Sequence, residues 1–225
     1  MQVRLRNSFA RSVGVVATLA TLAMLSSLAA CAPRAVDRAP AAPQPVLLSV
    51  QDAEHVARLI RMEDGRALDT ALVAALLGTG SPELRARAAV AAGRIRDRHA
   101  TTMLVAALED PHPTVRRSAA FALGELGDSA EYVIAALADL AVGPDALVAA
   151  EAVAAMGQVG IAAAQPALEL LLGSERTLPH VRHAALLAAW RLPRSETLTA
   201  AVQRWAQHAD AETRWRAHYS LQRIG

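Results

Sequence analysis

Apolar and small residues return at regular intervals in five segments of the 225-residue chain. Within each segment they follow steps of four, four and three, which is the spacing of one face of an α-helix. The columns are Leu84, Ala88, Ala92 and Ile95; Val115, Ala119, Leu123 and Leu126; Val148, Ala152, Met156 and Val159; Val181, Ala185, Ala189 and Leu192; and Thr213, Ala217, Leu221 and Ile224. We therefore predict five helices that bury this face.

Residues that favour helix starts fall in phase with these columns. The segments are 81–95, 112–126, 145–159, 178–192 and 210–224, so their starts lie 31, 33, 33 and 32 residues apart. Good N-cap residues and first-turn prolines occupy the first two columns: Ser81, Asp145 and Asp210, then Pro82, Pro113 and Pro179. A proline at the first helical position is favourable because its missing N–H has no intrahelical acceptor there.

A second set of short apolar runs lies between these helices, at 73–77, 105–109, 134–138 and 167–171. Two helices in a unit of about 32 residues predict an all-α fold, an α-solenoid of antiparallel helix pairs. The composition agrees, because 53% of the residues are hydrophobic but only 3% are aromatic, which favours packed helices over a β-sandwich. Residues 49–63 are predicted to form an extra N-terminal helix.

The segment "DPHPTVRRSAAFALGELGD", residues 110–128, resembles the short bacterial HEAT repeats that also occur in phycobilin-lyase-type proteins. The resemblance covers about residues 66–225 as five repeats. It implies a ladder in which an Asp of the turn pairs with an Arg six residues later, so Asp110 and Arg116 are the expected structural pair. The ladder is fragmentary, because Arg85, Arg182 and Arg214 lack that acid and Ala149 replaces the Arg. Tetratricopeptide repeats fit less well, because their Trp, Gly, Tyr and Pro columns are missing.

The first 30 residues have the pattern of an export signal. Residues 1–12 are basic, and residues 13–30 carry no charge and end in small side chains. The sequence "LAAC", residues 28–31, resembles the lipobox of bacterial lipoproteins, which implies that Cys31 carries the lipid and becomes the mature N-terminus. The alternatives are an ordinary cleavable signal with an incidental cysteine and a marginal membrane anchor.

The resulting organisation has three parts: a lipoprotein signal peptide over 1–30, a tether rich in Pro and Ala over 31–47, and the repeat solenoid over 48–225. The lipobox resemblance implies an exported protein of the bacterial cell envelope that contacts the membrane through its lipid. Ala32 follows the cysteine, which in such lipoproteins favours the periplasmic face of the outer membrane.

Charge argues against a nucleic-acid partner. Three of the 23 Arg precede residue 31 and the chain has no Lys, which leaves 20 Arg against all 21 acids and a charge of about −1. A nucleic-acid binder carries a basic footprint that this composition lacks.

Chemical motifs are sparse. The sequence has no phosphate-binding loop, HExxH, cysteine pair or G-x-S-x-G motif, so we assign no catalytic residues, no cofactor and no metal site within the chain. His180 and His183 stand three apart and could face one metal, but no acid is nearby, and a solvated or capping role is expected.

Protein binding is the remaining prediction. On the second helix of each repeat, the columns that face away from the core contain the candidate residues Arg117, Phe121, His183, Leu187, Trp215 and Tyr219. Exposed aromatic residues and Arg are enriched at interface centres. The alternative for Phe121 and Leu187 is packing between neighbouring helices.

The aromatic residues also cluster along the chain. Four of the six after the signal, Trp190, Trp205, Trp215 and Tyr219, lie in the last 36 residues. This crowding predicts a docking surface, whereas its alternative is that these rings fold back on Trp205 and close the solenoid internally. We therefore expect a lipid-anchored adaptor for a protein or peptide partner; the alternative is the N-terminal HEAT-repeat part of a larger envelope enzyme such as a peptidyl-prolyl isomerase.

Overall fold

The computed structural model describes residues 49–225, and in this range the chain forms α-helices and short 3₁₀ turns without any strand. The helices are α2 (Val50–Gly65), α3 (Thr70–Thr79), α4 (Pro82–Ile95), α5 (Thr101–Ala107), α6 (Pro113–Leu126), α7 (Glu131–Ala141), α8 (Ala146–Val159), α9 (Gln165–Gly173), α10 (Pro179–Ala189), α11 (Glu196–Gln203) and α12 (Ala211–Ile224). Three 3₁₀ segments, η1 (Arg98–Ala100), η2 (Ala162–Ala164) and η3 (Arg204–Gln207), adjoin α5, α9 and α11.

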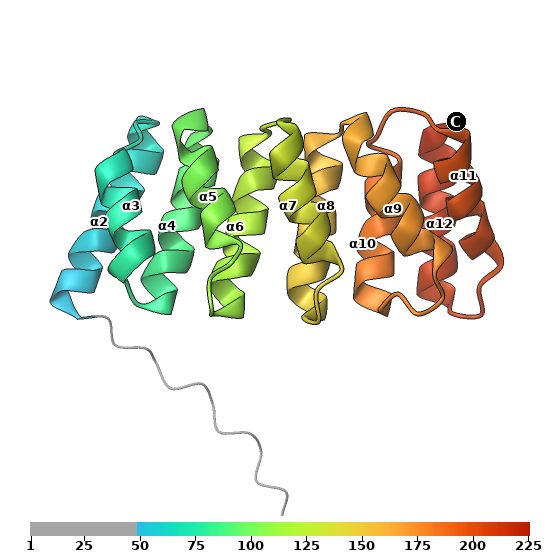
Figure 1. Ribbon diagram of the computed structural model, residues 1–225, viewed down its shortest axis with the longest axis horizontal. Coiled ribbons are helices and arrows are strands. Elements are labelled where there is room, and N and C mark those ends of the chain that lie inside the picture. Colours follow the sequence, from blue (N-terminus) through green and yellow to red (C-terminus); the bar gives the residue numbers. More distant parts are fainter. Residues whose placement is uncertain (1–48) are drawn as a thin grey trace, which may run out of the picture. The chain divides into compact units, whose positions relative to one another are not determined.

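The helices of residues 49–225 lie in two layers (Figure 1). Helices α3, α5, α7, α9 and α11 form one layer, here called the A layer; helices α2, α4, α6, α8, α10 and α12 form the other, the B layer. Successive helices pack much more closely in the B layer than in the A layer. The predicted all-α solenoid is confirmed.

The core lies between the two layers and runs the length of the solenoid. The central column of the B helices is fully or almost fully buried, as at Leu123 of α6 and Met156 of α8. Leucines of the A helices, such as Leu137 and Leu168, close the core from the other side. Each such side chain contributes roughly 1.5–3 kcal/mol by leaving water, so apolar packing between repeats is the main source of stability.

Helix starts follow the predicted signals. The side chains of Ser81, Asp145 and Asp210 accept hydrogen bonds from backbone N–H groups in the first turns of α4, α8 and α12. Prolines occupy the first positions of α4, α6 and α10. His112 and Leu178, which precede α6 and α10, make no side-chain cap, so proline geometry and packing define these two starts.

Glycines let the B helices approach each other very closely. A Cβ atom at Gly93 of α4 would lie 2.5 Å from Cα of Ala122 on α6. The same relation recurs one repeat later, where Gly124 faces Ala155, and again where Gly157 faces Ala188. At Gly93 and Gly157 a Cβ would lie less than 3.0 Å from the backbone of the next helix, whereas at Gly124 it would first meet the end of the Gln158 side chain. Three successive interfaces between B helices, here called joints, therefore favour a residue without a side chain.

The last joint of the B layer, between α10 and α12, breaks this pattern, because Trp190 occupies the glycine position of its repeat. Its indole ring lies beside Arg223 of α12, with the guanidinium carbon 4.8 Å from the ring centroid. Helix α12 accordingly packs less closely on α10 than α6, α8 and α10 pack on their predecessors. The looser interface between the last two B helices thus coincides with a bulky ring in the glycine column.

The Arg column differs from the expected ladder. Asp110 and Arg116 do not pair through their side chains; instead, both carboxylate oxygens of Asp110 accept hydrogen bonds from Arg85 of the preceding repeat, at 2.7 and 2.8 Å. Arg116 donates to the main-chain carbonyls of Asp110 and Pro111. The pair of Arg85 and Asp110 therefore links neighbouring repeats. Hydrogen bonds from Arg85 hold the pKa of the Asp110 carboxyl group below its usual value.

Cys31, the signal peptide and the tether lie outside the described residues, so these predictions remain predictions. No helix within residues 49–225 is long and apolar enough to cross a membrane.

Candidate protein-binding surface

The sequence-predicted binding residues all lie on B-layer helices. Arg117 and Phe121 belong to α6, His183 and Leu187 to α10, and Trp215 and Tyr219 to α12. Arg117 and Trp215 are exposed, whereas the other four are half-buried. The structure therefore brings the six residues onto one layer, spread over three helices rather than gathered in one pocket.

Ion pairs between successive helices cross the N-terminal part of this surface. Glu63 of α2 pairs with Arg87 of α4, and Arg96, just after α4, pairs with Glu125 of α6 at 3.3 Å. Glu151 of α8 is half-buried, and burial raises the pKa of its carboxyl group, while the positive charge of Arg117 on α6 opposes this shift. Positive and negative groups thus alternate along α2, α4, α6 and α8.

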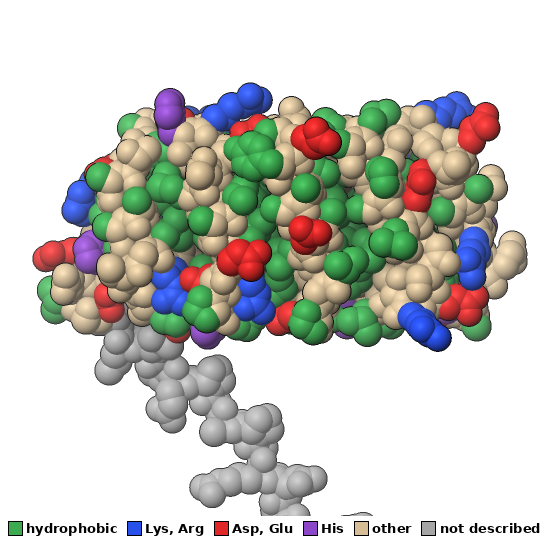
Figure 2. Space-filling view, in the orientation of Figure 1, with side chains coloured by type: hydrophobic (Ala, Val, Ile, Leu, Met, Phe, Trp, Pro, Cys, Tyr) green, Lys and Arg blue, Asp and Glu red, His purple; other side chains and the backbone are tan. Residues whose placement is uncertain are grey.

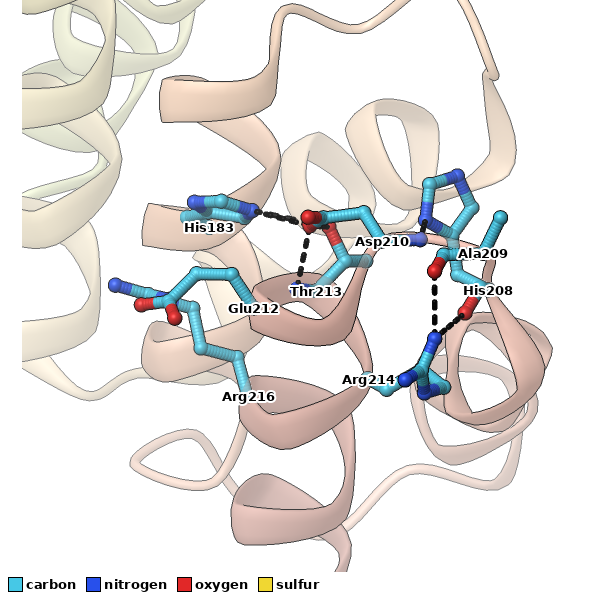
Figure 3. A network of polar contacts seen from close by, with 8 residues as sticks. All are labelled: His183, His208, Ala209, Asp210, Glu212, Thr213, Arg214 and Arg216. Atoms are coloured by element: carbon cyan, nitrogen blue, oxygen red, sulfur yellow. Dashed lines mark hydrogen bonds and ion pairs between the residues drawn. The ribbon is translucent and has the colours of Figure 1, made fainter.

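At the C-terminal end, His183 belongs to a polar network between α10 and α12 (Figure 3). Thr213 is fully buried, and its hydroxyl donates to Asp210 Oδ2 at 2.7 Å. Its oxygen lies 3.0 Å from His183 Nε2, so the imidazole N–H donates to it. His183 thus connects α10 to the cap of α12, and burial of its ring is the main cause that lowers its pKa.

The same network fixes the start of α12. Hydrogen bonds from the side chain and backbone of Thr213 lower the pKa of Asp210 to about 2. Arg214 donates to the carbonyls of His208 and Ala209, and Arg216 pairs with Glu212 one turn away (Figure 3). An acid, a hydroxyl and an imidazole meet here, but each of these polar contacts caps a helix or links two helices, which indicates a structural role.

The C-terminal aromatic residues divide into two groups. Trp205 is only 2% exposed; its Nε1–H donates to the carbonyl of Leu172, and the guanidinium of Arg182 lies 4.4 Å from the centroid of its ring. Trp215 is 56% exposed and stacks on Tyr219, with ring centroids 5.4 Å apart and planes 22° apart. Trp205 therefore serves the core, whereas Trp215 presents an aromatic face to solvent.

Trp190 is a surface residue whose role the sequence analysis missed. Together with Arg194, Ser195, Leu198 and Arg223 it lines a slot of about 180 Å³ where α10, α11 and α12 meet. The signal was present in the sequence, because Gly93, Gly124 and Gly157 occupy its column in three repeats. An aromatic ring in a column of glycines indicates a locally altered joint.

The A-layer surface has a different character. Figure 2 shows hydrophobic side chains in the valleys between the A helices, with scattered charges around them. One hollow of about 320 Å³ lies between α3 and α5, beside Leu77 and Met103. Another, of about 340 Å³, lies beside Leu170 and Leu178. These hollows are apolar, shallow and without an aromatic lining.

Within residues 49–225, no group of three or more His, Cys, Asp and Glu side chains is arranged to hold a metal ion. His180 is exposed at the start of α10, and His183 turns to Thr213.

Comparison with known families agrees with this geometry. Residues 70–157, from the start of α3 into α8, match the family model of HEAT repeats. The helix pairs that follow continue the same two-layer arrangement. No curated protein matches the chain in sequence.

Solved structures show the same fold. A chain of the complex of CpcE and CpcF of phycocyanin lyase from Nostoc sp. PCC7120 has a TM-score of 0.59 and 23% identity, over 85% of this chain and 70% of that one. A designed armadillo repeat protein in complex with the peptide (KR)4 has a TM-score of 0.57 and 17% identity, over 78% of this chain and 90% of that one. The expected resemblance to HEAT-like repeats of the phycobilin-lyase type is confirmed at the level of the fold.

Proposed function

We propose that this protein is a non-enzymatic scaffold of the bacterial cell envelope, held to a membrane by a lipid on Cys31, that binds a protein partner on its B-layer surface. The observation that carries the binding part of the proposal is the exposed, stacked pair of Trp215 and Tyr219 on α12. A large aromatic ring left in water contributes to stability only when another surface covers it.

The regular spacing of the B helices supports the same proposal. Because each repeat contacts only its neighbours, a solenoid presents equivalent positions at fixed intervals and so forms an extended binding surface. The designed armadillo repeat protein of similar fold is in complex with a peptide, which is a precedent for peptide binding on stacked helices. We infer that the partner contacts several repeats of this chain.

Site-specific photocrosslinking in cells tests the binding surface. A photoreactive amino acid at position 117 or 215, on exposed B-layer positions, is expected to crosslink to a protein partner. The matched control is position 139, an exposed residue of α7 in the A layer. Crosslinks from position 139 alone would show that the partner binds the other layer. Crosslinks from none of the three positions would mean that the chain is not a scaffold.

The anchor is tested separately. Cys31→Ser is expected to move the protein from the membrane fraction to the soluble fraction, or to leave it unprocessed, because the sequence beyond the signal is nearly neutral and provides no other strong attraction to lipid. Detergent phase partitioning and immunoblotting measure the change. The lipid proposal fails when wild type and Cys31→Ser partition equally into detergent.

A further inference from the structure

Arginines outnumber acids near the C-terminal end of the B layer. Residues 179–194 contain three Arg and no acid, and α12 contains three Arg and one acid. Three of these six are engaged by other groups: Arg182 by Trp205, Arg214 by backbone carbonyls, and Arg216 by Glu212. The other three, Arg191, Arg194 and Arg223, are exposed and form no ion pair with any described residue.

Aromatic rings interleave with these guanidinium groups. Arg191 lies 5.2 Å and Arg223 4.8 Å from the ring centroid of Trp190. Arg223 also lies 5.0 Å from the ring of Tyr219, which stacks on Trp215. One continuous row from the turn after α10 to α12 is formed by Arg191, Trp190, Arg223, Tyr219 and Trp215. Each ring holds a neighbouring Arg by cation–π attraction and orders it without neutralising its charge.

The altered joint creates space within this row. Trp190 stands in the column where three other B helices have glycine, and with Arg194 and Arg223 it lines the slot where α10, α11 and α12 meet. Arg191 lines the next hollow along the layer, together with Gly157, Gly160 and the ion pair of Arg96 with Glu125. The three Arg side chains without an ion pair among the described residues therefore border accessible space.

We propose that this row binds an acidic segment of the partner protein, whose carboxylates contact Arg191, Arg194 and Arg223 and whose apolar side chain covers Trp215. Charge complementarity defines the occupant, because a carboxylate accepts hydrogen bonds from a guanidinium group in a bidentate manner. The proposal rests on the proposed scaffold function and adds the chemistry of the partner.

The surroundings favour an acidic peptide over a nucleic acid. Arg and aromatic side chains also bind single-stranded nucleic acids, but such proteins follow the phosphate backbone with an extended basic groove. Here the basic row is confined to α12 and the turn after α10, and Glu125 and Glu151 interrupt the layer on the preceding helices. A phosphate chain that continued along the solenoid would meet these carboxylates.

Fluorescence anisotropy with a labelled peptide of alternating Glu and Leu tests the proposal, using the full chain purified in detergent and micelles alone as a blank. The wild type is expected to bind this peptide and not the corresponding peptide of Lys and Leu. Arg223→Glu should weaken binding about tenfold or more, because it replaces an attraction by a repulsion. Trp215→Ala should weaken binding of the same peptide by removing the apolar contact.

The matched control is Arg94→Glu, which changes the same column of the repeat at the other end of the solenoid and should alter the affinity by less than about twofold. Equal losses in Arg94→Glu and Arg223→Glu would overturn the proposal, as would equal binding of the Lys peptide. Tighter binding of a labelled oligothymidine would assign the row to nucleic acid instead. When B-layer crosslinks form in cells but the Glu peptide does not bind, only this inference fails.

Discussion

Replacing Leu123 by alanine is expected to lower the free energy of unfolding by about 2–5 kcal/mol. Leu123 is fully buried in the central column of α6, where both helix layers enclose it. Alanine leaves a cavity there that the flanking repeats cannot fill without moving. Because each repeat is stabilised by its neighbours, the loss should reach α4 and α8 and appear as faster amide exchange in all three helices.

The matched control for this prediction is Leu170→Ala on α9, the same chemical change at a side chain that is 66% exposed. It should change the free energy of unfolding by no more than about 0.5 kcal/mol. Urea denaturation followed by circular dichroism measures both variants. Equal stabilities would show that the assignment of faces on α6 is wrong.

Adding a single methyl group at Gly93 is expected to destabilise the solenoid by about 1–3 kcal/mol, although alanine is ordinarily the better helix former. The reason is the joint between α4 and α6, where a Cβ atom would lie 2.5 Å from Cα and 2.7 Å from the carbonyl oxygen of Ala122. Backbone atoms cannot rotate away as a side chain can, so the two helices must separate along their length.

Gly78→Ala makes the same change at a helical position of α3 that has no atom within 4 Å of the new methyl group. It should stabilise the protein by up to about 1 kcal/mol through helix propensity alone. Thermal unfolding of the two variants distinguishes the effects by sign. A stabilising effect of Gly93→Ala would mean that the B helices do not touch at the glycines.

Local and periodic features of the fold could be predicted from the sequence. The caps at Ser81, Asp145 and Asp210 depend on residues within the same turn, and the buried columns follow from the helical period. Such features need no knowledge of the neighbouring helix. The order of the helices and their antiparallel pairing then follow from the repeat length.

Features that depend on which residue of a neighbouring helix lies opposite could not be predicted in this way. Asp110 binds Arg85 of another repeat rather than the nearby Arg116, because the carboxylate faces the preceding helix pair. Trp205 and Trp215 look alike in the sequence, yet one is buried beneath Arg182 and the other faces solvent. Only the positions of α10, α11 and α12 distinguish them.

The indole at position 190 also has a consequence for cooperativity. In a linear array, the coupling between adjacent units determines where the structure opens first. The joint between α10 and α12 lacks the close backbone contact of the three joints before it, so α11 and α12 are expected to detach at a lower cost than the central helix pairs. A ligand that spans Trp190 and Trp215 bridges this joint and, by mass action, stabilises the closed form. Binding of a ligand to this surface is therefore expected to reduce local unfolding of α11 and α12.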